Sequence, residues 1–247
     1  MATADAVRKD TNARKSAAVR RKALDYIREM KRIDGWLSAA EAHCFVELDA
    51  AQKAAGIHGD LVEIGVWQGR GAILFHHLLR EDECVHAVDI FDLRDRDHPY
   101  FNDPQILQAN ARNFGCDDRL RPIRMDTSRD GHRLLDIVRP ESVRILHIDG
   151  GHDYEVVRRD IEVARRMLGE GAALVFDDFF NRRHPATTQA IMEFLLSTPA
   201  IVPFMVTGKK LWTCEAGRHI DFLRHMKSAK VASRKAVLFQ RTVLVAD

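Results

Sequence analysis

Residues 143–154 read VRILHIDGGHDY, and residues 172–178 read AALVFDD. Each segment is an apolar run of strand length that ends in acid: Asp149 follows the first run, and Asp177 and Asp178 follow the second. The residues between the two segments have the spacing of a single helix, which predicts a strand–helix–strand unit with a right-handed crossover. Parallel strands joined in this way end on the same edge of the sheet, where open α/β folds bind their ligands.

The convergence of carboxylates makes this edge a candidate metal site. Three carboxylates repel one another unless protons or a cation relieve the repulsion. Oxygen ligands suit small divalent ions, so we expect Asp149, Asp177 and Asp178 to hold Mg²⁺ or Ca²⁺. A purely structural role is the alternative, because an acid at a strand end often caps the helix that follows.

The composition indicates a soluble globular protein with one α/β domain and an appendage. Of the 247 residues, 46% are hydrophobic and 30% are charged, and a chain of this length can bury a substantial core. The formal net charge of +2 gives no general reason to expect a nucleic-acid partner.

The cysteines and the N-terminal residues predict the compartment. The four cysteines (Cys44, Cys84, Cys116 and Cys214) lack the C-x-x-C spacing of zinc sites and form no disulfide framework, which is typical of a reducing compartment. No apolar run is long enough to cross a bilayer, and the first residues lack the profile of a secretory signal. We therefore expect a cytoplasmic protein that does not bind membranes.

Two helices are predicted in residues 13–56, after a disordered tail of residues 1–12. The first helix places apolar residues opposite a basic face, and the second begins at Ser38, where Glu41 completes a capping box. The basic face is interpreted as solvated surface, and a lid or dimerisation element over the ligand site is the alternative.

Residues 57–247 form the main domain, in which strand and helix patterns alternate. Strands are predicted at residues 61–66, 85–89, 120–125, 143–148 and 172–176, with further strands in the tail at residues 201–215 and 236–245. This alternation indicates an α/β fold with a doubly wound, mostly parallel sheet.

Residues 63–71, EIGVWQGRG, are read as a strand end, a glycine-bearing turn and a helix start. Glycine allows the backbone to approach a ligand closely. The spacing differs from the GxGxxG fingerprint of dinucleotide sites, which disfavours a pyrophosphate cofactor. Asp89 ends the next strand, where an acid can accept both hydroxyls of a ribose, and Asp126 and Ser128 follow the strand after it.

These motifs, in this order along the chain, resemble those of the class I S-adenosylmethionine-dependent methyltransferases. The run DGGHDY at residues 149–154 is similar to the D-G-x-H-x-Y motif of one branch, close to the macrocin and mycinamicin sugar O-methyltransferases. The resemblance covers the chain from about Trp36 to its C-terminus. It implies a seven-stranded, Rossmann-like fold, S-adenosylmethionine as cofactor, a hydroxyl of a small molecule or sugar as acceptor, and a homo-oligomer such as a dimer.

The resemblance also implies which residues contact the cofactor. They lie in the glycine turn and at the ends of successive strands: Glu63, Gly65, Val66, Trp67, Gly69, Asp89, Asp126, Ser128 and Asp149.

A metal and a base follow from the same resemblance. In catechol O-methyltransferase and its relatives, an acid after the fourth strand and an acidic pair after the fifth hold Mg²⁺, and the 28 residues from 149 to 177 match that separation. Those enzymes have a lysine base three residues after the first acid, where this chain has His152. Sugar-modifying relatives have an aspartate one residue earlier, where this chain has Gly151. His152, with Asp149, is therefore the expected catalytic pair, and Asp153 is the alternative base.

Two loops follow these strands. Residues 91–101 are long for a strand–helix connection, so they are interpreted as a segment that closes over substrate, with Tyr100 and Phe101 suited to a planar or sugar acceptor. Their alternating charges favour the alternative, a solvated and mobile segment. Residues 181–184 are expected to be an exposed loop, in which an arginine could hold an anionic group.

Two other functions fit the sequence. The first is a methyltransferase that uses no metal, in which the acids position the acceptor. The second is a nucleotide-binding module without catalysis, whose basic N-terminal helix recruits RNA or an acidic partner.

Overall fold

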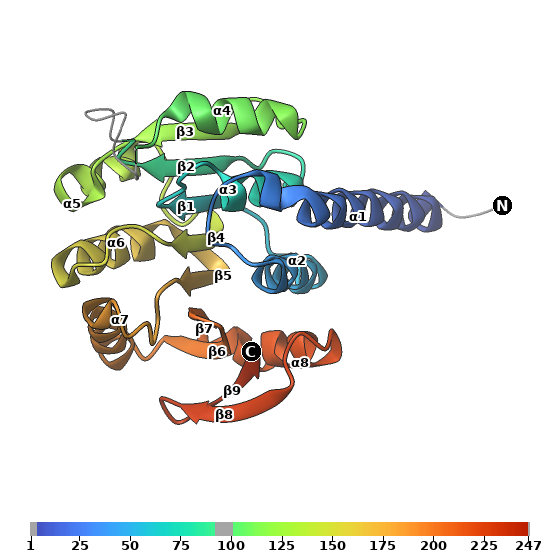
Figure 1. Cartoon of the computed structure of the whole chain (residues 1–247). Coiled ribbons are helices and arrows are strands. Elements are labelled where there is room, and N and C mark those ends of the chain that lie inside the picture. The colour runs from blue at the N-terminus through green and yellow to red at the C-terminus, as the bar shows by residue number, and fades with distance from the viewer. Residues whose placement is uncertain (1–3, 92–100, 247) are drawn as a thin grey trace.

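One mixed β-sheet runs through the molecule, with helices on both of its faces (Figure 1). The structure is a computed structural model that describes residues 4–91 and 101–246, and it describes the backbone alone for residues 4–16. The substrate loop predicted at residues 91–101 therefore lies almost entirely outside the described residues.

The strand order is β3-β2-β1-β4-β5-β7-β6-β9-β8. The first five strands of this order are parallel, and the order reverses between β1 and β4, where doubly wound sheets bind ligands. β7 runs antiparallel to both of its neighbours, β5 and β6. The strands are β1 (Asp60–Ile64), β2 (Val85–Asp89), β3 (Leu120–Arg124), β4 (Val143–Ile148), β5 (Leu168–Phe176), β6 (Ile201–Thr207), β7 (Lys210–Glu215), β8 (Arg234–Leu238) and β9 (Arg241–Ala246).

The expected α/β fold is confirmed, but the described sheet has nine strands rather than seven. The difference lies in the tail, which folds into two hairpins. In the second hairpin, Phe239 and Gln240 have φ angles of 49° and 59°, so both connecting residues are left-handed, as in a tight two-residue turn.

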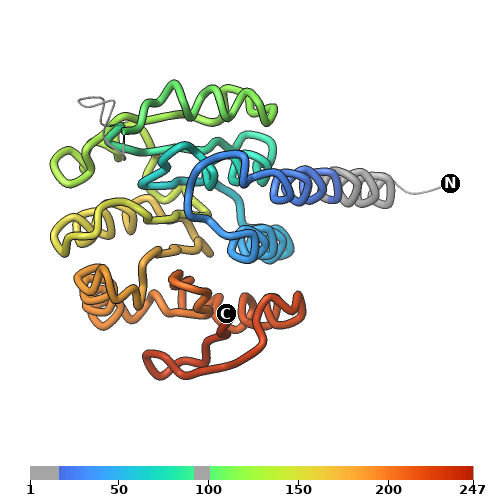
Figure 2. Tube along the Cα trace, in the orientation of Figure 1, coloured from blue at the N-terminus to red at the C-terminus, as the bar shows by residue number. Residues whose placement is uncertain are grey.

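The helices form two layers, each over its own buried cluster (Figure 2). α1, α2, α3, α4 and α8 pack on one face, while α6, α7 and the 3-10 segment η2 pack on the other. The helical bounds are α1 (Ala4–Glu29), η1 (Met30–Arg32), α2 (Ala39–Ala54), α3 (Arg70–His77), α4 (Pro104–Asn113), α5 (Thr127–Asp130), η2 (Gly131–Asp136), α6 (Tyr154–Met167), α7 (Pro185–Ser197), η3 (Ala216–Arg218) and α8 (His219–Ser228).

The N-terminal helices pack on the main domain. α1 begins at Ala4, before the helix start predicted at residue 13. Its C-terminal half buries Ala23 and Ile27, and η1 buries Met30, in the same cluster as the strands. The capping box predicted for α2 is confirmed, since the Glu41 backbone N–H donates to Ser38 Oγ and the Ser38 N–H donates to the Glu41 carboxylate.

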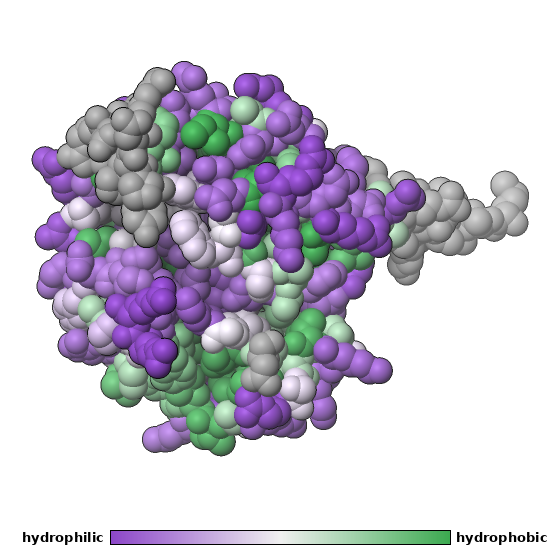
Figure 3. All heavy atoms as spheres, viewed as in Figure 1, coloured by the Kyte–Doolittle hydropathy of each residue, from purple (hydrophilic) through white to green (hydrophobic). Residues whose placement is uncertain are grey.

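The surface is mainly polar in the view of Figure 3, with hydrophobic residues gathered toward the C-terminal strands. Val237 and Leu196 are among the large apolar side chains that stay exposed. Within the described chain, the helices all fall short of the length and apolar character needed to span a membrane.

Candidate active site

The acidic and glycine motifs converge on the carboxyl edge of the parallel strands. Gly65 follows β1, Asp149 follows β4 and Asp177 follows β5. Sheet-like hydrogen bonds continue through them, because the Asp149 N–H donates to Ile64 O at 2.8 Å and the Asp177 N–H donates to Ile148 O at 2.9 Å. The two acids therefore lie side by side at the strand ends, as the strand–helix–strand pattern predicts.

Gly65 is required where the cofactor turn meets β4. Its φ of 85° is left-handed, and a Cβ at this position would lie 2.0 Å from the backbone oxygen of Asp149. A side chain would therefore push the glycine turn away from the acidic edge.

Asp89 stands at the end of β2, with both carboxylate oxygens facing backbone donors. Oδ2 accepts the Trp67 N–H and Oδ1 accepts the Phe91 N–H, each at 2.9 Å. Burial raises the pKa of Asp89, and these hydrogen bonds oppose the rise. The carboxylate is thus held against the glycine turn, as expected of a ribose acceptor.

Two asparagines that sequence reasoning missed hold the glycine turn in place. Asn102 Nδ2 donates to Trp67 O at 2.8 Å, and Asn110 Nδ2, from α4, donates to Gln68 O at 2.9 Å. Asn102 lies 35 residues from Trp67 in sequence, and Asn110 lies 42 residues from Gln68. No local sequence pattern could therefore have identified these contacts.

Trp67 meets the N-terminal region. Its indole Nε1 donates to Asp34 Oδ2 at 3.1 Å, and its ring centroid lies 5.6 Å from that of Trp36. Trp36 is 65% exposed. Arg70, the first residue of α3, donates to the backbone oxygens of Ile33 and Leu37, so the segment that carries Trp36 is tied to the cofactor turn.

Three other predicted cofactor residues make local contacts. Asp126 caps α5 by accepting the Ser128 N–H at 3.1 Å and the Ser128 hydroxyl at 2.5 Å. Glu63 is 4% exposed and hydrogen-bonds His147 Nδ1 at 2.9 Å. A Cβ on Gly71 would lie 2.1 Å from Glu63 Oε1. The Glu63 carboxylate therefore packs directly against the start of α3.

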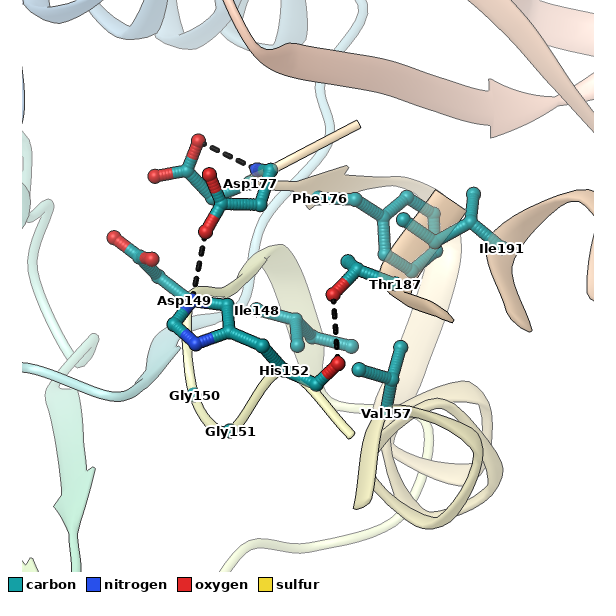
Figure 4. Close-up of a pocket in the computed structure, with 11 residues that line it drawn as sticks. Ile148, Asp149, Gly150, Gly151, His152, Val157, Phe176, Asp177, Thr187 and Ile191 are labelled. Atoms are coloured by element: carbon teal, nitrogen blue, oxygen red, sulfur yellow. Dashed lines mark hydrogen bonds and ion pairs between the residues drawn. The ribbon is translucent and has the colours of Figure 1, made fainter. Parts of the chain in front are cut away.

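Asp149 and Asp177 approach each other closely. Ligand atoms of His147, Asp149 and Asp177 all lie within 4.8 Å of one another. Loss of hydration raises the pKa of Asp149 well above its ordinary value, and the Asp177 carboxylate adds to this rise. Figure 4 shows both carboxylate groups on the same side of the strand ends, above the Gly150–Gly151 loop.

Lys210, which was not among the predicted site residues, lies beside this pair. Its Nζ is 2.8 Å from Asp177 Oδ2. Burial opposes the ionisation of Asp177, but the Lys210 ammonium holds the pKa of Asp177 below its ordinary value. Phe176 pairs with Leu211, and the Phe179 N–H donates to Lys209 O, so the sheet register delivers Lys210 to the acidic edge.

Asp178 groups with His152 and His184 instead of with the other two acids. Its Oδ2 lies 2.7 Å from His152 Nε2, and its Oδ1 accepts a short hydrogen bond from Asn181 Nδ2. Asp178 has a φ of 55°, so the chain makes a left-handed turn directly after Asp177. The expected three-acid cluster is therefore divided in this structure: Asp149 and Asp177 share one place, and Asp178 pairs with the histidine.

His152 is held from three sides. Its backbone oxygen accepts the Thr187 hydroxyl at 3.2 Å, as Figure 4 shows, and its ring stacks on His184 with centroids 3.8 Å apart. The loop expected to be exposed at residues 181–184 thus contributes Asn181 and His184 to the site. Asp153, the alternative base, is instead the residue before α6.

Comparison with known proteins identifies the domain. Residues 62–179 match a protein family described as a methyltransferase domain. The matched range begins in β1 and ends just after Asp178, so it contains the glycine turn, Asp89, the DGGH loop and the acidic pair.

Several solved structures share the fold. The O-methyltransferase NovP has a TM-score of 0.59 and 18% identity, over 72% of this chain and 80% of that one. CalS11, a TDP-rhamnose 3′-O-methyltransferase, has a TM-score of 0.54 and 20% identity, over the same shares. MycE from the mycinamycin pathway, solved with Mg and S-adenosylhomocysteine, has a TM-score of 0.51 and 16% identity, over 74% of this chain and 51% of that one.

The sheet order and the cofactor edge define a class I methyltransferase fold. Residues 62–179 match the methyltransferase domain family, and this range holds the residues of the expected S-adenosylmethionine site. The shared fold and the matched range agree with the expected class.

Proposed function

We propose that this enzyme transfers a methyl group from S-adenosylmethionine to a hydroxyl of a small molecule, with a sugar as the favoured acceptor. The observation that carries the proposal is the His152–Asp178 pair, at 2.7 Å, beside Asp149 on the cofactor edge. The similar structures support the acceptor class, since NovP and CalS11 are both named as O-methyltransferases and CalS11 acts on a sugar nucleotide.

The cofactor is proposed to lie along the glycine turn. Gly65, Val66, Trp67 and Gly69 would offer backbone to the amino-acid end, and Asp89 would accept the ribose hydroxyls. Asp126 and Ser128 would flank the adenine, and Asp149 would face the sulfonium end. Glu63 is assigned an indirect role, because its contacts are with His147 and Gly71 beneath the turn.

His152 is proposed as the general base. If Nε2–H donates to Asp178, the imidazole has its lone pair on Nδ1, and the carboxylate stabilises the imidazolium that forms. In the transfer, the acceptor O–H gives its proton to Nδ1 while its oxygen forms a bond to the methyl carbon. The S–CH₃ bond breaks, its electron pair stays on sulfur, and S-adenosylhomocysteine leaves.

A divalent cation fits part of the expected ligand set. Asp149 and Asp177 offer hard oxygen donors within reach of one another, as a small divalent ion prefers. We propose that these two acids hold Mg²⁺, as the presence of Mg in the MycE structure suggests by similarity. Such an ion would lower the pKa of an acceptor hydroxyl and fix its oxygen. Asp178 is assigned to His152 instead of the metal.

One observation favours the second candidate, a methyltransferase that needs no metal. Lys210 already supplies one buried positive charge to Asp177. In that case the ammonium alone would offset the acids, and Asp149 would orient the acceptor.

The test combines binding with turnover. Calorimetry with S-adenosylhomocysteine should show one site per chain, and a panel of sugar and phenolic hydroxyl acceptors should yield methyl ethers when incubated with labelled S-adenosylmethionine. A protein that binds no S-adenosylhomocysteine would overturn the proposal. Initial rates with a chelator, and with Mg²⁺ restored, then distinguish the two candidates, since only the first requires the ion.

The remaining expectations stay predictions: a homo-oligomer, a cytoplasmic location, and a lid or dimerisation role for the N-terminal helices.

A further inference from the structure

Lys210 is a fully charged side chain in the interior of the protein. It begins β7, it is 1% exposed, and its Nζ contacts Asp177 Oδ2 at 2.8 Å and His147 Nε2 at 3.0 Å. An ammonium group is rarely buried unless its neighbours are arranged to receive it. The neighbours of Lys210 are arranged in this way.

The hydrogen-bond directions around Lys210 are determined by its chemistry. An ammonium group only donates, so His147 Nε2 must accept, and the ring proton must lie on Nδ1. Nδ1 then donates to Glu63 Oε1 at 2.9 Å. His147 is therefore neutral, and its one lone pair is used by Lys210.

The same neighbours would make a metal site if Lys210 were absent. The ligand atoms of His147, Asp149 and Asp177 lie within 4.8 Å of one another, and one nitrogen with two carboxylates is a common donor set for divalent metals. Lys210 Nζ already contacts two of these three residues. A bound ion would meet an ammonium group with the same sign of charge and would find His147 engaged.

We propose that Lys210 is a tethered cation beside the His147–Asp149–Asp177 site, and that it lowers, without abolishing, the affinity of this edge for the divalent ion that Asp149 and Asp177 are proposed to hold. The lysine supplies part of the positive charge that the acids require, and it keeps Asp177 in place whether or not a metal is bound. The inference rests on the proposed function only in assuming that an acceptor lies beside Asp149. The contacts that Lys210 makes in this site do not depend on the reaction.

Lys209 provides a matched control one residue away. Its side chain is 60% exposed, and its Nζ lies 3.9 Å from Asp178 Oδ1. Substituting either lysine by methionine removes the same charge and leaves a side chain of similar length. Only Lys210→Met also removes the partner of His147 Nε2 and of Asp177 Oδ2.

The experiment compares Mn²⁺ binding by the wild-type chain, Lys210→Met and Lys209→Met, using calorimetry and the electron paramagnetic resonance signal of free Mn²⁺. Lys210→Met should bind Mn²⁺ at least about tenfold more tightly than wild type, because a like charge at contact distance is removed. Lys209→Met should stay within about threefold of wild type, as expected for an exposed charge. Equal or weaker Mn²⁺ binding by Lys210→Met would overturn the proposal.

Loss of Lys210 also leaves Asp177 without its partner, so folding has to be measured as well. Thermal unfolding of Lys210→Met should shift upward with added Mn²⁺ by more than that of wild type. The double variant Lys210→Met/Asp177→Asn removes both charges and should show no such gain. A gain in the double variant equal to that in the single variant would contradict the proposed site.

Binding of S-adenosylhomocysteine by the same samples separates this inference from the proposed function. A wild-type protein without cofactor binding would overturn the function, while the Mn²⁺ comparison would still decide the role of Lys210.

Discussion

Asp178 Oδ2 lies 2.7 Å from His152 Nε2, which places a carboxylate directly behind the imidazole that faces the cofactor edge. This contact gives the histidine a fixed tautomer and orientation. It also explains why Asp178 does not join Asp149 and Asp177, although the three acids are close in the strand pattern. Asp178 thus orients the proposed base, His152, and Asp177 pairs with Lys210.

His152→Ala should lower kcat by roughly 10²- to 10⁴-fold, the contribution of a positioned general base. Affinity for S-adenosylhomocysteine should change little, because the glycine turn and Asp89 are untouched. His132→Ala, which alters an exposed histidine on η2, is the control and should keep wild-type turnover. Equal turnover in wild type and His152→Ala would remove the histidine from this role.

Asp178→Asn tests the carboxylate behind the histidine. The amide keeps the shape but loses the charge that stabilises an imidazolium, so kcat should fall by about tenfold or more while the KM for the acceptor changes less. Initial rates over a range of acceptor concentrations give both constants. A variant with higher KM and unchanged kcat would indicate that Asp178 binds the acceptor instead.

Asp89→Ala should weaken S-adenosylhomocysteine binding by about 10- to 100-fold, as expected for the loss of hydrogen bonds to a charged group. Calorimetry measures this directly. Asp136→Ala, at an exposed position on η2, should leave the affinity unchanged. If Asp89→Ala bound the ligand as wild type does, the ribose contact would be wrong.

Gly65→Ala should destabilise the protein by about 3 kcal/mol or more, because its Cβ would overlap the Asp149 carbonyl. Gly115→Ala is the control: Gly115 has a similar φ of 71°, but a Cβ there meets nothing within 4 Å. The control should lose only the cost of a left-handed side chain, about 1–2 kcal/mol. Urea unfolding of both variants compares the two costs, and equal losses would show that the close approach to Asp149 is unimportant.

Asp160 on α6 should make stability depend on pH. It is 1% exposed, and burial raises its pKa to about 6. Thr127 nearby has a smaller, opposite effect on this pKa. Neither carboxylate oxygen has a hydrogen bond of good geometry. Below pH 4 the folded and unfolded chains both hold the proton. Between pH 4 and 6 the unfolded chain releases it first, so the free energy of unfolding falls by about 3 kcal/mol and then levels off.

Asp160→Asn cannot ionise and should lack this fall. Urea titrations at pH 4, 5, 6 and 7 measure the difference between the variant and wild type, which should grow up to pH 6 in favour of the variant. Asp118→Asn, at an exposed site, should follow wild type. A constant difference across this range would show that Asp160 does not titrate there.

The parts of the site that lie at the ends of parallel strands could be predicted from sequence. Gly65, Asp89, Asp149 and Asp177 each follow an apolar run, and the strand–helix alternation fixes which edge they share. The capping box at Ser38 was equally predictable, because all of its hydrogen bonds lie within four residues.

The contributions of the tail could not be predicted. Lys210 reaches the site only because β7 enters the sheet between β5 and β6 in the antiparallel direction, and its partner His147 is 63 residues away. The one feature near Lys210 in sequence is its place at the start of β7, a strand that is buried except at its last residue. The pairing of Asp178 with His152 was missed for a different reason, since the left-handed φ of Asp178 has no signature in the residues DDFF.

The anchoring of residues 33–37 by Arg70 has a consequence for where the catalytic unit begins. Phe45 of α2 packs against Phe75 and Trp212, with ring centroids 4.9 and 4.5 Å apart, so the N-terminal helices share the core of the domain that follows them. A protein shortened to residues 57–247 would expose that aromatic cluster and free the arginine that opens α3. The smallest independently folding enzyme should therefore retain α2 and the end of α1, and proteolysis inside residues 33–37 should abolish cofactor binding along with stability.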